Sequence, residues 1–162
     1  MKVLFLDVDG VLNSNERRAY DYEGIRGMDP ELTGHLLRIV LQTGCKIVVS
    51  SSWRLGGIGP GSDFAVALAD ADRSGKCLDA VIGATPCRMS NYRRRNEILW
   101  WLTNEGALPK AQRFAILDDE PSSIVDGPDD WLREHMFATD DDLGLTEEIA
   151  DRVIAHLGRM PL

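Results

Sequence analysis

Five short, largely apolar runs alternate along the chain with longer stretches in which apolar residues recur every three or four positions. A short apolar run between polar or turn residues is typical of a strand that is buried on both faces of a parallel sheet. We therefore expect strands at Val3–Leu6, Ile47–Val49, Leu78–Ile82, Phe114–Leu117 and Met136–Thr139.

The stretches between these runs have the period of amphipathic helices. Asp29-Pro30-Glu31 predicts a helix start, because an acidic N-cap, a proline at the first helical position and an early acid all favour one. Gly44 predicts the end of that helix. Further helices are expected over Phe64–Asp72, from an arginine-rich segment through Leu102, and after Thr146.

Strands that alternate with helices predict an α/β fold, a Rossmann-like three-layer sandwich with a central five-stranded parallel sheet. The polar or glycine-rich segments Asn13–Met28 and Leu55–Gly61 are expected to be loops near the carboxyl ends of the first two strands. A chain of 162 residues is long enough for one core, so we expect a single domain over residues 1–162.

The composition limits the kinds of molecule that the protein is expected to bind and the compartment in which it is expected to work. Eighteen basic and 26 acidic residues give a formal charge of −8, which argues against broad binding to nucleic acid but leaves room for a local basic patch. Three cysteines without a CxxC pair predict buried thiols in a reducing compartment. The sequence has neither a signal peptide nor a membrane-spanning stretch, so a cytoplasmic location without a membrane partner is expected.

Two acids follow the first strand directly. Asp7 and Asp9 are two positions apart, so on a strand their side chains would share a face and point into one crevice. Their mutual repulsion predicts a cation nearby, although a strand end with solvated aspartates is the simpler alternative. Gly10 would let the chain turn away and let a ligand approach the backbone.

Other strand ends carry similar chemistry. Ser50 follows the second strand, and Asp118 and Asp119 follow the fourth. The carboxyl ends of parallel strands lie on one rim, so these side chains are expected to meet there. Carboxylate oxygens suit Mg²⁺, arginines and hydroxyls suit phosphate, and a carboxylate can attack phosphorus. A solvated loop and a polar turn are the simpler interpretations of these segments.

The ordered set of motifs resembles the haloacid dehalogenase-like (HAD) superfamily of phosphohydrolases over nearly the whole chain. The motifs are an Asp-x-Asp-Gly start, an apolar strand that ends in serine, a basic residue at a helix start, and an apolar strand that ends in two aspartates. Further features resemble a small capless branch associated with bacterial RNA-repair proteins: Ser50-Ser51-Ser52-Trp53-Arg54, Thr85-Pro86, the arginines before Glu97-Ile98, and Leu117-Asp118-Asp119-Glu120.

The resemblance implies roles for the first-motif acids. Asp7 would be the nucleophile and, through its other oxygen, a metal ligand. Asp9 would protonate the leaving oxygen, then take a proton from the attacking water, with its backbone carbonyl on the metal. Asp118 and Asp119 would complete a Mg²⁺ site, one of them directly and the other through water.

The same resemblance implies a phosphate-binding set. Ser50 would donate a hydrogen bond to the transferring phosphoryl group, and Ser51 is the neighbouring candidate. Gly10 and Arg54 are included in this set, the first for close backbone approach and the second for its charge.

The third motif departs from the superfamily, which usually has a lysine at this position. The chain offers Arg93, Arg94 and Arg95, and Arg94 best fits the spacing to Glu97-Ile98. Lys110 is the fallback, and a solvated helix face is the simpler interpretation of the arginines.

These observations predict a Mg²⁺-dependent phosphomonoester hydrolase that acts on a phosphorylated small molecule or a polynucleotide end, with RNA-repair proteins as candidate partners. Two alternatives stay open: a hydrolase-like fold that serves as a binding module after losing catalysis, and a receiver-type signalling module. A receiver has its acid pair after the first strand and its phosphorylated aspartate on a middle strand, an order that this chain does not follow. Substrate identity and oligomeric state are left open.

Overall fold

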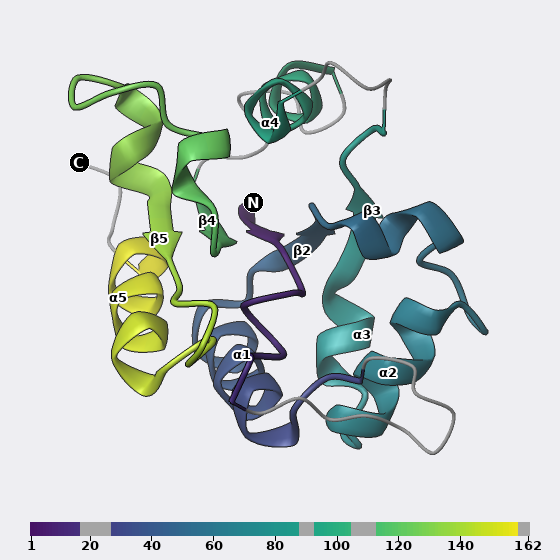
Figure 1. The fold of residues 1–162 in the computed structure, drawn as a ribbon. Helices are drawn as coiled ribbons and strands as arrows, with labels where there is room; N and C mark the ends of the chain where they lie inside the picture. Colours follow the sequence, from purple (N-terminus) through teal and green to yellow (C-terminus); the bar gives the residue numbers. More distant parts are fainter. Residues whose placement is uncertain (17–26, 88–92, 105–112, 159–162) are drawn as a thin grey trace.

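The apolar runs form a five-stranded, all-parallel sheet with the strand order β3-β2-β1-β4-β5, as Figure 1 shows. The computed structural model describes residues 1–16, 27–87, 93–104 and 113–158. The strands are β1 (Lys2–Leu6), β2 (Lys46–Val49), β3 (Val81–Ala84), β4 (Arg113–Asp118) and β5 (Met136–Ala138). The predicted α/β, Rossmann-like architecture is confirmed.

Helices cover both faces of the sheet (Figure 1). One face carries α1 (Pro30–Thr43), α2 (Asp63–Ala71), α3 (Lys76–Ala80) and α5 (Glu147–Gly158), and the opposite face carries α4 (Arg94–Asn104). The described residues also form three short 3₁₀-helices: η1 (Ser52–Gly56), η2 (Pro121–Ser123) and η3 (Trp131–His135).

The two faces of the sheet have separate cores because strand side chains alternate in direction. Leu4 and Leu6 of β1 pack in the core beneath α1, whereas Val3 and Phe5 pack in the core that Trp101 of α4 helps to form. These four side chains of β1 are fully buried, as expected for a central strand of a parallel sheet.

The predicted start and end of the first helix are confirmed. The Asp29 side chain accepts hydrogen bonds from the amides of Glu31 and Leu32, Pro30 occupies the first helical position, and Gly44 ends the helix with φ = 65°. The side chain of Thr146 accepts from the amide of Ile149 at the start of α5.

Two predicted boundaries were wrong. The run predicted as a strand at Leu78–Ile82 lies mostly in α3, and the strand begins only at Val81. Such a short apolar run fits either element, and the burial of Cys77 and Ala80, three positions apart, follows the helical period. The loop predicted from Leu55 overlaps the end of η1.

β1, β2 and β3 each continue their hydrogen-bond ladder for one residue beyond their carboxyl ends. The amide of Asp7 donates to the carbonyl of Leu117. In the same way, the amide of Ser50 donates to the carbonyl of Leu6, and the amide of Thr85 donates to the carbonyl of Val49. Among the described residues, no helix has both the length and the apolar character needed to cross a membrane.

Candidate active site

Four buried polar residues, Thr85, Ser50, Asp7 and Asp118, form a row across the carboxyl ends of adjacent strands. Strand register pairs Leu6 with both Val49 and Leu117. The residues one position further on, Asp7, Ser50 and Asp118, therefore lie side by side on one rim. The chain reverses its direction of travel across the sheet between β1 and β4, which is where open α/β sheets bind their ligands.

The acids of this rim converge. Asp7, Asp118 and Asp119 each offer a carboxylate oxygen, and these oxygens lie within 4.8 Å of one another. Burial and the charge of Asp7 raise the pKa of Asp118 to about 7, even though Arg94 opposes the shift. Burial and the same charge raise the pKa of Asp119. Negative charges this close require protons or cations to offset them.

The donor set fits a hard divalent cation. All three groups are carboxylates, and Oδ2 of Asp118 is buried without a hydrogen-bond partner. Mg²⁺ prefers such oxygen ligands and retains some of its water. Asp7, Asp118 and Asp119 would therefore hold the Mg²⁺ ion that the sequence predicts.

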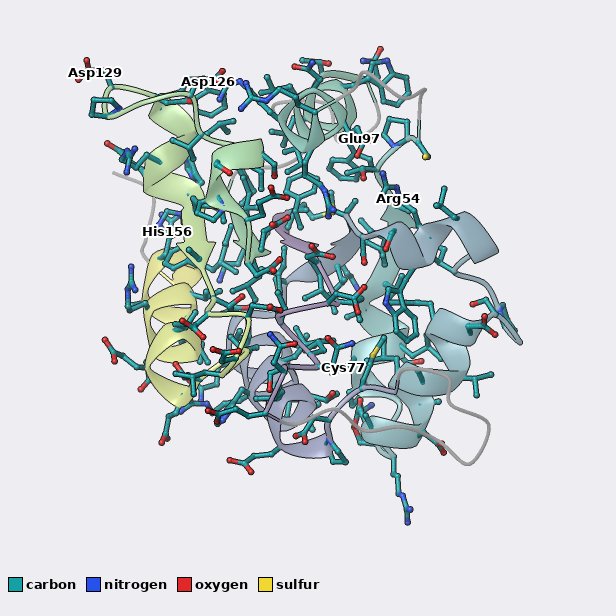
Figure 2. The ribbon with its side chains drawn as sticks, viewed as in Figure 1. Arg54, Cys77, Glu97, Asp126, Asp129 and His156 are labelled. Carbon is teal, nitrogen blue, oxygen red and sulfur yellow. The ribbon has the colours of Figure 1, made fainter. Side chains whose placement is uncertain are left out.

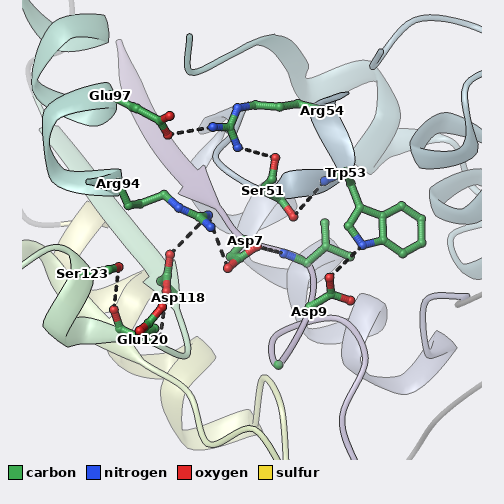
Figure 3. A network of polar contacts seen from close by, with 12 residues as sticks. Asp7, Asp9, Ser51, Trp53, Arg54, Arg94, Glu97, Asp118, Glu120 and Ser123 are labelled. Carbon is green, nitrogen blue, oxygen red and sulfur yellow. Dashed lines mark hydrogen bonds and ion pairs between the residues drawn. The ribbon is translucent and has the colours of Figure 1, made fainter. Parts of the chain in front are cut away.

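Arg94 is the cation that α4 brings to these acids (Figure 3). Its Nη1 lies 3.3 Å from Oδ2 of Asp7 and 3.5 Å from Oδ2 of Asp118. The charges of these two acids outweigh burial and raise the pKa of Arg94. The amide of Val8 donates to the other oxygen of Asp7 at 2.7 Å, so the Asp7 carboxylate is oriented from two sides.

The neighbouring arginines point elsewhere. Arg93 pairs with Asp126 and donates to the carbonyl of Ser122, while Arg95 pairs with Asp126 and Asp130. Among these three arginines, the structure thus brings Arg94 to the acids. The fallback candidate Lys110 lies outside the described residues.

The two serines after β2 differ in their contacts. The hydroxyl of Ser50 is buried and has no hydrogen-bond partner, so it is available to a ligand on the rim. The hydroxyl of Ser51 caps η1 by accepting from the amide of Trp53 at 3.4 Å. The contacts favour Ser50 as the phosphate-binding hydroxyl, and both assignments stay predictions.

Arg54 lies in a buried ion pair. Its Nη2 is 2.7 Å from Oε2 of Glu97, and its Nη1 donates to the carbonyl of Ser51 (Figure 3). The predicted contact of Arg54 with phosphate is therefore in competition with Glu97, whose involvement the sequence did not indicate.

Asp9 does not share a strand face with Asp7, because β1 ends at Leu6 and the chain turns from residue 9. Its carboxylate accepts from Nδ2 of Asn13 at 2.9 Å and from Nε1 of Trp53 at 3.2 Å. The carboxylate of Asp9 is absent from the three-acid group found in the described residues. Its acid–base role and the contact of its carbonyl with metal remain predictions.

Replacement of Trp53 with phenylalanine tests the support of Asp9. Phenylalanine keeps most of the apolar packing but removes the indole donor, so Asp9 is held by Asn13 and becomes less well oriented. We expect kcat to fall by about threefold to tenfold, with KM nearly unchanged. An unchanged kcat, measured in steady-state hydrolysis of an aryl phosphate, would show that the Trp53 contact is dispensable.

Gly10 meets a steric requirement that the sequence did not reveal. It has φ = 72°, and a Cβ at this position would lie 2.5 Å from Cγ of Asp119. The carbonyl of Gly10 also accepts from the hydroxyl of Thr139 at 2.7 Å, which fixes the turn. Gly10 therefore leaves space for a predicted metal ligand, and its predicted proximity to phosphate is untested.

Substitution of Gly10 by alanine is expected to destabilise the protein and displace Asp119. Gly75 is the matched control, since it also has φ = 72° but no heavy atom within 4 Å of an added Cβ. Backbone strain alone costs about 1–2 kcal/mol in either variant. The G10A variant should lose more unfolding free energy than G75A in denaturant titration, and should bind Mg²⁺ more weakly. Equal losses would contradict the steric role.

A cavity of about 370 Å³ adjoins the acids on the α4 side. Arg94 and Glu120 line it together with Arg54, Glu97 and Ser52. The cavity lies between η1, α4 and the segment after β4, and Arg94 links it to Asp7 and Asp118.

Comparison with known families agrees with this geometry. The sequence model of one family, described as "HAD domain in Swiss Army Knife RNA repair proteins", matches residues 3–150. No curated protein matches the sequence significantly. Since the match spans nearly the whole chain, including every strand and all the rim acids, this chain belongs to the HAD domain family of Swiss Army Knife RNA repair proteins.

Proposed function

We propose that this HAD-family domain is a Mg²⁺-dependent phosphomonoester hydrolase that forms an aspartyl-phosphate on Asp7. The observation that carries the proposal is the approach of Arg94 to Asp7 and Asp118, at 3.3 and 3.5 Å, beside a group of three convergent carboxylates. An acid nucleophile, a cation for the phosphoryl oxygens and oxygen donors for a metal are what phosphoryl transfer requires.

In the first step, one carboxylate oxygen of Asp7 attacks phosphorus, and the bond from phosphorus to the leaving oxygen breaks. Asp9, protonated, gives its proton to that oxygen, so the leaving group departs as an alcohol. Arg94 faces the attacked phosphate, and the free hydroxyl of Ser50 donates to one of its oxygens.

In the second step, Asp9 takes a proton from water, which attacks phosphorus and releases phosphate and the Asp7 carboxylate. Bound Mg²⁺ would supply positive charge that offsets the acids and the phosphate. Trp53 and Asn13 donate hydrogen bonds to the Asp9 carboxylate, and this support favours a fixed orientation for both proposed proton transfers.

The substrate is proposed only by class. The family description favours a phosphorylated polynucleotide end, handled beside RNA-repair partners, and a phosphorylated small molecule is the second candidate. The net charge of −8 disfavours a long nucleic-acid track and favours contacts limited to the phosphate and its immediate neighbours. We further propose that residues 1–162 act as a single domain in a reducing, cytoplasmic environment.

Phosphate release from a generic aryl phosphate tests the activity. We expect turnover that requires Mg²⁺ and disappears with a chelator, and a beryllofluoride adduct located on Asp7. An adduct without turnover would favour a receiver-like module. Mg²⁺ binding without adduct or turnover would favour a binding module that has lost catalysis. A panel of nucleotides, oligonucleotide 3′-phosphates and sugar phosphates would then identify the substrate class.

A further inference from the structure

The pair formed by Arg54 and Glu97 joins two elements of the site. Both side chains are only 8% exposed, and their ion pair is 2.7 Å long. Arg54 comes from η1, directly after the rim serines, and Glu97 comes from α4, as Figure 2 shows. Because Arg54 also donates to the carbonyl of Ser51, its guanidinium connects the segment after β2 to α4.

Burial of such a pair is not explained by stability alone. Desolvation of two charges consumes much of their mutual attraction, whereas removal of one partner leaves the other charge buried and unpaired. The role of the pair is therefore best judged from where each side chain would turn if its partner were removed. That question bears on Arg94, because Glu97 lies one helical turn after it on the same face of α4.

Glu97 is within electrostatic reach of both arginines. The charge of Glu97 contributes to the raised pKa of Arg94. Arg54 and Arg94 both oppose the rise that burial causes in the pKa of Glu97. Arg94 thus has three acids around it, and its 3.3 and 3.5 Å contacts with Asp7 and Asp118 are longer than the contact between Arg54 and Glu97.

We propose that Arg54 is a positioning residue that occupies Glu97 and thereby leaves Arg94 directed at Asp7, Asp118 and the substrate phosphate. Without Arg54, the buried Glu97 carboxylate draws Arg94 toward itself and away from the rim. The kinetic test of this inference rests on the proposed function. The position of the Arg94 side chain provides a second test that does not depend on activity. In this proposal Arg54 acts through Glu97 and does not contact the phosphate directly, as the sequence had predicted it would.

Three variants distinguish the two roles of Arg54: R54Q, E97Q and the double variant R54Q/E97Q. We expect R54Q to lose about 10- to 100-fold in kcat/KM and to bind inorganic phosphate more weakly in the presence of Mg²⁺. E97Q should lose less kcat/KM than R54Q, since Arg94 keeps its contacts with Asp7 and Asp118 while only Arg54 loses its partner. The double variant should recover to within about tenfold of wild type, because no charge then competes for Arg94.

Lack of recovery in the double variant, with thermal stability near that of wild type, would overturn the inference and assign Arg54 to the phosphate itself. Full activity of R54Q would overturn it as well. If R54Q does not fold, the comparison of the double variant with wild type decides, because it has no unpaired buried charge. R38Q is the matched control: Arg38 pairs with Glu147 and Asp151 between α1 and α5, so its loss should leave kcat/KM unchanged.

A crystal structure of R54Q separates this inference from the proposed function. Arg94 paired with Glu97 in that variant supports the inference even if wild type proves inactive. Arg94 still directed at Asp7 and Asp118 overturns it even if wild type is an active phosphatase.

Discussion

Replacement of Asp7 with asparagine is expected to lower phosphate release by about 10⁴-fold or more. The amide has nearly the same shape but does not attack phosphorus, so no aspartyl-phosphate forms. The fold should survive, because the backbone contact of Asp7 with Leu117 does not depend on the side chain and an amide oxygen can still accept from Val8.

The measurement is steady-state hydrolysis of an aryl phosphate together with detection of the covalent adduct by mass spectrometry. Asp129→Asn is the control, since Asp129 is exposed at an edge of the molecule (Figure 2) and does not belong to the three-acid group. Turnover of D7N above about 1% of wild type would contradict covalent catalysis at Asp7.

Replacement of Asp118 with asparagine should move activity and stability in opposite directions. We expect a loss of about 10²- to 10³-fold in Mg²⁺-dependent turnover, because a buried acid of the three-carboxylate group becomes neutral. At pH 8 without metal, the same change should raise the free energy of unfolding, because it removes a buried charge next to Asp7.

The pH dependence follows from the pKa of Asp118, which is raised from 3.8 to about 7 on folding. Between these values the folded state holds a proton that the unfolded state has lost. The contribution of Asp118 to stability therefore falls as pH rises from about 4 to 7, by about 1.4 kcal/mol for each unit of difference in pKa. Without metal, wild type should lose stability over this window relative to D118N.

Denaturant unfolding at pH 5 and pH 8, with chelator or with Mg²⁺, measures these effects. Mg²⁺ should stabilise wild type at pH 8 and have little effect on D118N. If metal-free D118N is less stable than wild type at pH 8, Asp118 does not carry the unfavourable charge that its burial implies.

The contacts of Arg54 change how an arginine near a phosphate site is interpreted. Its position just after the serines that follow β2 favoured a direct phosphate contact. In the structure its guanidinium instead forms an ion pair with Glu97 and donates to the carbonyl of Ser51. A buried acid with a dedicated arginine leaves the second arginine, Arg94, available to the rim. The local charge balance thus depends on a residue, Glu97, that belongs to no predicted site.

The sequence alone determined the sheet and its rim. Unbroken apolar runs such as Val3–Leu6 have no polar face, so they must be buried on both sides, and helices between them enforce parallel strands. Once the strands are parallel, acids at the carboxyl ends of β1 and β4 share one edge. The convergence of Asp7, Asp118 and Asp119 therefore follows from local pattern and connectivity.

Tertiary structure decided which side chains of a cluster reach the rim and what holds them there. Three consecutive arginines look equivalent in sequence, but Arg93 precedes α4, and Arg94 and Arg95 within it point about 100° apart. The packing of α4 therefore brings Arg94 to the acids, whereas Arg93 and Arg95 pair with acids of the segment after η2. The contact of Trp53 with Asp9, 44 positions away, and the space that Gly10 leaves for Asp119 have no local signal. They arise because distant segments pack together, and periodicity along the chain does not encode which distant partners meet.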